Sequence, residues 1–204
     1  MEQRLRLHHN LVREIMVCTL CRLHEARKNP VPGEGPIPSR VMIVGEAPGR
    51  KEDEAGRPFV GQAGRLLDKL LALANLSRSE VYITNVVKCR PPGNRDPRHD
   101  EIAACMSYLS RQIQLVEPEI IMAVGRIAGA TLYRMAGLRW RGIRADRGKL
   151  VYGTIAGRKV GIYATFHPAA ALYNREILPL LEDDFRRLGD ILRGNKGRSL
   201  LDFL

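Results

Sequence analysis

The most constraining feature of this sequence is a set of four short apolar runs separated by segments with helical spacing. The runs cover Arg40–Gly45, Val81–Val87, Glu119–Gly125 and Val160–Phe166. Strands buried on both faces read as nearly continuous hydrophobic runs, because neither side of the pleat meets water. Strands that alternate with helices favour a parallel sheet covered by helices on both faces. We therefore expect a single-domain α/β fold with a central four-stranded parallel sheet.

The segments between and around these runs complete the expected organisation. Helical spacing is found in Ala63–Leu76, Asp100–Val116, Ile127–Ala136 and Ile177–Leu192. Residues 1–25 are expected to form a helix that ends near a cysteine pair, while Asn29–Ser39, with its four prolines, and Arg90–Arg98 are expected to be extended or looped. We assign residues 1–193 to one folded domain and residues 194–204 to a basic C-terminal tail.

The composition fits a globular protein that meets a polyanion. The 204 residues are 45% hydrophobic, which is enough for a substantial core. Lys plus Arg is 33 against 22 for Asp plus Glu, and a net charge of +11 favours a polyanionic partner through counterion release. The alternative is the Arg-rich surface of a thermophile, since Arg and Glu are abundant and Asn and Gln are few.

Neither a membrane helix nor a secretory signal is expected. No apolar run reaches the length of about 18 residues that a membrane-spanning helix needs. The first residues, Met1–Arg6, lead into no apolar segment. We therefore expect a cytoplasmic, nucleoid-associated protein without a membrane partner.

The four cysteines point to a metal site rather than to disulfides. Cys18 and Cys21 form a C-x2-C pair, and Cys89 and Cys105 follow with 15 residues between them. A cytosolic chain has little use for disulfides, whereas four thiolates complete the ligand shell of a 4Fe–4S cluster or a structural zinc. Zinc ribbons usually have two tight pairs, so the spacing favours the cluster. Incidental cysteines, two of them merely buried, are the third alternative.

Polar residues follow three of the four expected strands where each strand ends. Glu46 comes after the first, Asn85 lies near the end of the second, and His167 comes after the last. Ligands of open parallel sheets bind beyond the carboxyl ends of the strands, so these three side chains should converge. Each has a structural explanation when taken alone, and their joint position is what favours a functional site. The remaining strand ends at Gly125, where backbone can approach a ligand closely.

The same segments carry a resemblance to a known family. The blocks are Gly45–Gly49 followed by Glu52-Asp53, Phe59–Gly64, Thr84–Pro92 and His167–Ala170. In this order, together with the four cysteines, they resemble the family 4, iron–sulfur type of uracil-DNA glycosylase over about Cys18 to Leu188. The resemblance implies a monofunctional hydrolase of base excision repair, which flips uracil out of single- or double-stranded DNA and leaves an abasic site. It also implies a monomer with a 4Fe–4S cluster held by Cys18, Cys21, Cys89 and Cys105.

Against that family, the pocket residues take definite roles. The expected uracil-binding residues are Glu46, Ala47, Phe59, Asn85, Asn94 and His167. Phe59 supplies a stacking face, although a place in the core is its alternative. Asn85 offers a donor and an acceptor that suit O4 and N3–H of uracil. His167 donates to O2, where negative charge develops as the glycosidic bond breaks.

The sequence does not decide which carboxylate acts on the attacking water. A distantly related family has an aspartate for this purpose at the position of Ala47, which cannot serve. Glu46 and Glu52 are the remaining nearby carboxylates, so the expected catalytic residues are Glu46, Glu52 and His167. No lysine apart from Lys88 lies in the strand-end motifs, so a Schiff-base lyase activity is not indicated.

Several residues beside the motifs are expected to contact DNA. The basic ones are Lys88, Arg90, Arg95, Arg98 and Arg175, which suit sequence-independent contacts to phosphates. Leu172 or Tyr173, after His167, could wedge into the gap left by the flipped base. Packing of Leu172 in the core is the alternative.

Three rival functions compete with this interpretation. A basic redox carrier would explain the cysteines but not Asn85 and His167 at the strand ends. A non-catalytic DNA-binding module would not need Glu46 and Phe59 as well. A glycosylase for another base differs only in pocket shape, which sequence does not reveal.

The C-terminal tail resembles a further recognition element. Residues 197–204 read GRSLLDFL, in which Leu200, Phe203 and Leu204 have the i, i+3, i+4 spacing of the peptide that docks on the PCNA sliding clamp. The glutamine usual at the first position is Gly197 here. A terminal helical turn packed on this protein's own core is the alternative.

Overall fold

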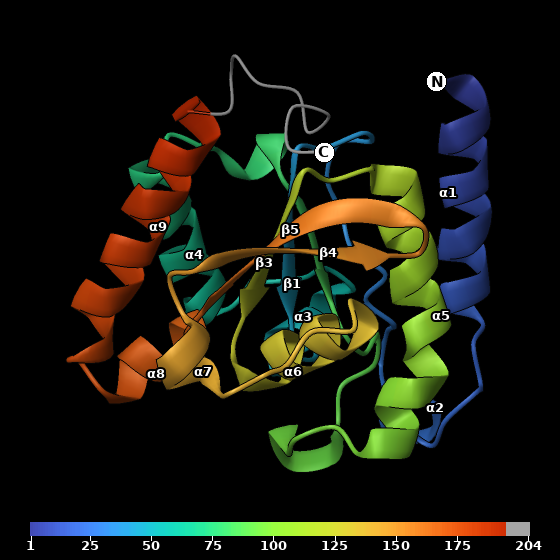
Figure 1. Cartoon of the computed structure of the whole chain (residues 1–204). Helices are drawn as coiled ribbons and strands as arrows, with labels where there is room; N and C mark the ends of the chain where they lie inside the picture. The colour runs from blue at the N-terminus through green and yellow to red at the C-terminus, as the bar shows by residue number, and fades with distance from the viewer. Residues whose placement is uncertain (195–204) are drawn as a thin grey trace.

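The computed structural model describes residues 1–194 as one α/β domain (Figure 1). The expected clamp-binding residues of the tail, Leu200, Phe203 and Leu204, lie outside the described residues. The α/β class is confirmed, and the sheet has five strands in the order β2-β1-β3-β5-β4 rather than the four that we expected. Four strands run parallel, namely β1 (Val41–Gly45), β2 (Tyr82–Asn85), β3 (Ile120–Val124) and β5 (Arg158–Thr165).

The fifth strand, β4 (Leu150–Ile155), pairs antiparallel with β5 at the edge of the sheet. Its first residues are only partly buried, so it lacks the continuous apolar run that marks the parallel strands. The turn between β4 and β5 places Ala156 and Gly157 at positive φ, the conformation that tight hairpins require. An edge strand exposed on one side is the kind of strand that a search for continuous apolar runs overlooks.

Alternate residues of the parallel strands face two separate helical layers. Met42, Val44 and Ile121 pack against α5 (His99–Val116) and α6 (Arg126–Met135). Their neighbours on the other face pack against α4 (Gln62–Leu73) and α9 (Ile177–Gly194). Because both faces are covered, β1, β2 and β3 are buried throughout, as is β5 from Val160 onward, which confirms the reason for their apolar runs.

The remaining helices are short or peripheral. Outside α5 lies α1 (Glu2–Met16), whose Leu11 and Ile15 pack on Tyr108. The others are α2 (Leu23–Ala26), α3 (Arg50–Ala55), α7 (Ile143–Asp146), α8 (Pro168–Tyr173) and the 3-10 turns η1 (Arg78–Glu80) and η2 (Pro92–Asn94). No helix among residues 1–194 combines the length and apolarity that a membrane crossing requires.

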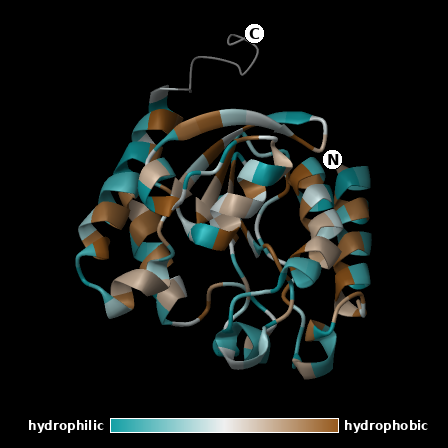
Figure 2. Cartoon of the chain, turned by 60° about the horizontal axis from the view of Figure 1, so that its bottom comes forward, coloured by the Kyte–Doolittle hydropathy of each residue, from teal (hydrophilic) through white to brown (hydrophobic). Residues whose placement is uncertain are grey.

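The two sides of the domain that lie at opposite ends of the strands differ. The loops after β1, β2, β3 and β5 gather at the carboxyl edge of the sheet, at the bottom of Figure 1, and Figure 2 turns this edge toward the viewer. Helix α1 begins, and α9 ends, on the opposite side of the molecule (Figure 1). The short helices α3 and α8 lie with these loops at the carboxyl edge (Figure 1).

Candidate active site

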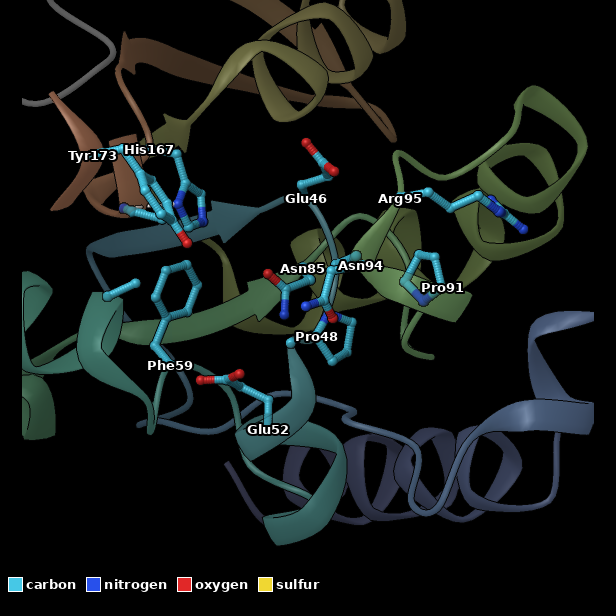
Figure 3. Close-up of a pocket in the computed structure, with 14 residues that line it drawn as sticks. Glu46, Pro48, Glu52, Phe59, Asn85, Pro91, Asn94, Arg95, His167 and Tyr173 are labelled. Atoms are coloured by element: carbon cyan, nitrogen blue, oxygen red, sulfur yellow. Dashed lines mark hydrogen bonds between the residues drawn. The ribbon is translucent and has the colours of Figure 1, made fainter. Parts of the chain in front are cut away.

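A pocket of about 310 Å³ opens at the carboxyl edge of the sheet. Its lining brings together residues that the sequence had singled out, and Figure 3 shows Glu52, Phe59, Asn85 and His167 around a common space. They include Glu46, Ala47, Glu52, Phe59, Asn85, Asn94, Arg95, His167 and Tyr173. Gly45 at the end of β1 pairs with Asn85 at the end of β2, so the parallel register itself places the two motifs side by side.

Asn85 forms a buried polar floor with one atom left unsatisfied. Its side chain is 1% exposed, and its Oδ1 has no hydrogen-bond partner among the described residues. A Cβ on Gly45 would come within 2.3 Å of that oxygen and 2.7 Å of Cζ of Phe59. Glycine at position 45 therefore keeps space open between Asn85 and Phe59. A buried acceptor without a partner costs stability unless a ligand supplies the donor.

Phe59 is held in an unusual backbone conformation beside this floor. It has φ 51° and is 6% exposed, although its ring lines the pocket. Oε1 of Glu52 accepts hydrogen bonds from the backbone N–H groups of Val60 (2.9 Å) and Gly61 (2.8 Å). The Arg78 guanidinium donates to the carbonyl oxygen of Phe59 at 3.1 Å. These contacts stabilise a strained loop, and the anchoring by Arg78 has no signal in the sequence.

His167 is a neutral donor with a fixed orientation. It precedes α8, and its Nδ1 accepts a hydrogen bond from the backbone N–H of Ala169 at 3.1 Å. That contact assigns the ring proton to Nε2. Burial lowers the pKa of His167 to about 4, against a smaller opposing effect of Glu52. The ring stacks on Phe59 with centroids 5.5 Å apart.

Glu46 differs from Glu52 because, within residues 1–194, its carboxylate accepts no hydrogen bond from a backbone N–H group. Burial raises the pKa of Glu46 to about 7, and the Asp96 carboxylate adds to the rise while Arg126 opposes it. One oxygen of Glu52 is already engaged by two backbone groups. The raised pKa gives Glu46 a proton affinity in the range that acid–base work requires.

Of the residues expected to contact DNA, Arg95 and Tyr173 line the pocket. Leu172 is 45% exposed and Tyr173 is 91% exposed, so the alternative of a buried Leu172 is wrong. Arg175 is exposed, whereas Arg90 donates to Oδ1 of Asn94 (2.7 Å) and Arg95 forms a bidentate pair with Glu101. The two latter arginines thus also order the loop between β2 and α5.

Lys88 does not lie on the DNA-facing surface, so its expected role in phosphate contact is wrong. Its side chain is 1% exposed and its Nζ donates to Thr84 Oγ1, Asn85 O and Gln112 Oε1. Lys88, the motif residue next to Cys89, points into the protein because it follows β2, and both faces of that strand are covered by helices.

The four cysteines line one small cavity beside α5. All four are free thiols, with Cys89 and Cys105 buried and Cys18 and Cys21 half-buried. The Arg27 guanidinium donates to Sγ of Cys89 at 3.0 Å, a contact the sequence did not suggest. Within residues 1–194, no set of His, Cys, Asp or Glu side chains is arranged tightly enough for a single metal ion. A cavity walled by four thiols and two neighbouring cations, Arg27 and Lys88, fits a larger anionic group.

The comparisons with known proteins place this chain in a family. A sequence model of the Uracil DNA glycosylase superfamily matches residues 32–188, so the chain belongs to that superfamily. The chain is 47% identical to a type-4 uracil-DNA glycosylase of Saccharolobus solfataricus, over 94% of this chain and 88% of the relative. It is 44% identical to that of Archaeoglobus fulgidus (96% and 98% covered) and 42% identical to that of Thermotoga maritima (86% and 90%). Within the superfamily, it is a member of the type-4 group.

Proposed function

We propose that this chain hydrolyses the N-glycosidic bond of uracil that has been flipped out of DNA, leaving an abasic site for base excision repair. The observation that carries the proposal is the buried, unpartnered Oδ1 of Asn85 at the floor of the pocket. A base extruded from the stack is read through its Watson–Crick edge and through stacking. Membership in the type-4 group supports the same reaction.

The Asn85 amide explains the choice of base. Oδ1 would accept from N3–H of uracil, while Nδ2 would donate to O4. Cytosine presents an acceptor at N3 and a donor at the 4-position, so both contacts would become repulsive. Leaving buried polar groups unpaired costs about 1–3 kcal/mol each. The ring of Phe59 would stack on the base, which is worth about 1–3 kcal/mol.

His167 would stabilise the departing base. Its Nε2–H is set by the contact of Nδ1 with Ala169, so the donor exists before substrate arrives. As the bond to the sugar breaks, negative charge builds toward O2 of uracil, and a preorganised donor in a desolvated site lowers this barrier by about 3 kcal/mol. A neutral imidazole donates without first binding a proton.

Glu46 is the carboxylate that we assign to the attacking water. The sugar becomes oxocarbenium-like, and the ionised Glu46 would orient the water and stabilise the positive charge. Glu52 would contribute by holding the Phe59 loop, since its Oε1 is engaged by Val60 and Gly61. Ala47, which also lines the pocket, has no group that could activate water. Asn94 would orient water or DNA at the rim.

A 4Fe–4S cluster would be bound by Cys18, Cys21, Cys89 and Cys105. The thiols come from the segment after α1, the loop after β2 and helix α5, so the bound group would tie three separate parts of the chain together. The cluster would supply cross-linking of the fold. The Arg27 contact to Cys89 would help to stabilise its negative charge.

We propose DNA and a sliding clamp as partners of a monomeric, cytoplasmic and nucleoid-associated enzyme. The net charge of +11 and the exposed Leu172, Tyr173 and Arg175 beside the pocket suit a DNA duplex or single strand. Residues 194–204 would form the tail that docks on PCNA through Leu200, Phe203 and Leu204. A truncation ending at Asn195 should lose clamp binding and keep uracil excision; equal clamp binding by both proteins, or by neither, would contradict the clamp proposal.

The reaction is tested with uracil-containing single- and double-stranded oligonucleotides followed by alkali. Strand scission at the uracil position is expected for the wild-type protein, with none on the matching cytosine oligonucleotide. His167→Ala is the matched variant, and single-turnover release should fall about 100-fold while the DNA Kd stays within about twofold. Alkali-resistant DNA after incubation with cluster-loaded wild-type protein would overturn the proposal.

A further inference from the structure

Lys88 is a buried cation that the proposed reaction does not use. Its Nζ lies 2.8 Å from Thr84 Oγ1, 2.6 Å from Asn85 O and 2.7 Å from Gln112 Oε1. Three acceptors match the three donors of an ammonium group, and none of these three partners is a carboxylate. Gln112 is itself fixed, because its Nε2 donates to Pro32 O at 2.6 Å. The side chain is therefore held in one place by a satisfied network.

The network acts on the backbone of the residue that reads the base. Asn85 ends β2, and its carbonyl oxygen accepts from Lys88 just where the strand gives way to a turn. The following N–H groups of Val86 and Val87 donate to Gly45 O (2.9 Å) and Glu46 O (3.1 Å). Lys88 thus fixes the Asn85 carbonyl group directly before the two backbone contacts that join the end of β2 to the end of β1.

The same residue lines the cysteine cavity. Lys88 precedes Cys89, and both border the cavity together with Cys105. One residue therefore contributes to the wall of the cysteine site and, through its side chain, to the position of Asn85. The two sites share no side chain among their linings, so this connection is not visible from either pocket alone.

We propose that Lys88 is a positioning residue, which sets the orientation of the Asn85 amide against the base and connects that orientation to the cysteine site. The proposal rests on the role assigned above to Asn85. It predicts that Lys88 affects base release and not DNA affinity, because it touches neither DNA nor the uracil. It also predicts that the effect passes through Asn85.

A double-mutant cycle tests this connection. Lys88→Met removes the three donors and keeps an apolar stem of similar length. Single-turnover uracil release should slow by about 10- to 100-fold, as small misplacements of a reading group do, while the DNA Kd and iron per chain stay near wild type. In an Asn85→Ala background, the added Lys88→Met change should cost less than about twofold. Equal losses in both backgrounds would overturn the proposal.

Two variants separate positioning from general loss of stability. Leu188→Ala, in α9 on the other face of the sheet, is a buried cavity variant that lowers Tm without reaching the network. It should leave the release rate within about twofold of wild type at a matched loss of Tm. Thr84→Val removes one acceptor of Lys88 with little change of shape, and it should slow uracil release in the wild-type background but not in the Asn85→Ala background. If Lys88→Met fails to fold, Thr84→Val takes its place in the double-mutant cycle.

The outcomes also distinguish this proposal from the proposed function. If Asn85→Ala alone leaves uracil release unchanged, the pocket assignment fails and the positioning role fails with it. If Asn85→Ala is strongly impaired but Lys88→Met and Thr84→Val release uracil at the wild-type rate, only the positioning role is overturned.

Discussion

The pocket at the carboxyl edge and the cysteine cavity both take residues from the segment that follows β2, and they differ in how their polar atoms are paired. In the pocket, Oδ1 of Asn85 is buried without a partner. Beside the cysteines, Lys88 Nζ has three partners and Cys89 Sγ accepts from Arg27. The unsatisfied atom marks the place where a transient ligand completes the structure, whereas the satisfied network forms a permanent scaffold.

The largest expected effect comes from removing a cysteine of the proposed cluster site. Cys105→Ser removes a buried thiolate from the proposed cluster site, and we expect loss of the brown colour, of bound iron and of most folded protein, because metal binding contributes directly to folding. Iron analysis and circular dichroism of anaerobically purified protein measure this. One zinc and no iron in the wild-type protein would contradict the cluster.

Changing the other atom of the Asn85 amide, Nδ2, should remove function. Asn85→Asp replaces the Nδ2 donor by a second acceptor that faces O4 of uracil. Single-turnover release should fall by about 100-fold or more, which corresponds to about 2.7 kcal/mol. The DNA Kd, measured in the same preparation, should stay close to wild type, because Asn85 lies at the floor of the pocket and not on the surface that meets phosphates. Unchanged release in this variant would show that Asn85 does not read the base.

The pH dependence of uracil release, a smaller effect, should distinguish Glu46 from Glu52. The Glu46 pKa is raised to about 7, so its carboxylate is protonated as pH falls below that value. Release should then decrease by about tenfold per pH unit, and Glu46→Gln should be slow and lose this dependence. Since ionisation of a buried group with a raised pKa costs stability above that pKa, Glu46→Gln should also raise Tm above pH 7 relative to wild type. His167, with its pKa lowered to about 4, should add no further step between pH 5 and 8.

The smallest expected effect belongs to the second carboxylate. Glu52→Gln keeps a carbonyl oxygen that can still accept from the N–H groups of Val60 and Gly61. Release should fall less than about fivefold, because only the strength of charge-assisted hydrogen bonds is lost. Glu52→Ala, which removes the acceptor, should lower both release and Tm. A loss in Glu52→Gln as large as that in Glu46→Gln would move the catalytic carboxylate to Glu52.

Much of this architecture could be predicted because it follows from burial. The parallel strands are apolar on both faces, so their runs stand out in the sequence, and the carboxyl ends of parallel strands must meet at one edge. That rule alone brought Glu46, Asn85 and His167 together. The edge strand β4 was missed because it is half exposed and has no continuous run.

The sequence also does not reveal which partner a charged side chain takes, and for Lys88 this made the prediction of a phosphate contact wrong. Lys88 and Arg95 look alike in a basic motif, yet Lys88 is buried under Gln112 and Arg95 pairs with Glu101. Their partners are 24 and six residues away in the chain, and a buried network depends on tertiary packing that local sequence does not encode. Glu52 was correctly placed at the pocket, but its two backbone contacts depend on the conformation of the Phe59 loop.

The position of the first helix relative to the pocket has a practical consequence for handling the protein. Because α1 begins on the side away from the carboxyl edge, material joined ahead of α1 would leave the domain facing away from the pocket (Figure 1). A purification tag, a fluorescent label or a surface-immobilisation linker attached there would leave the approach to the pocket free. Single-molecule measurements on DNA stretched across a surface would therefore need no redesign of the domain.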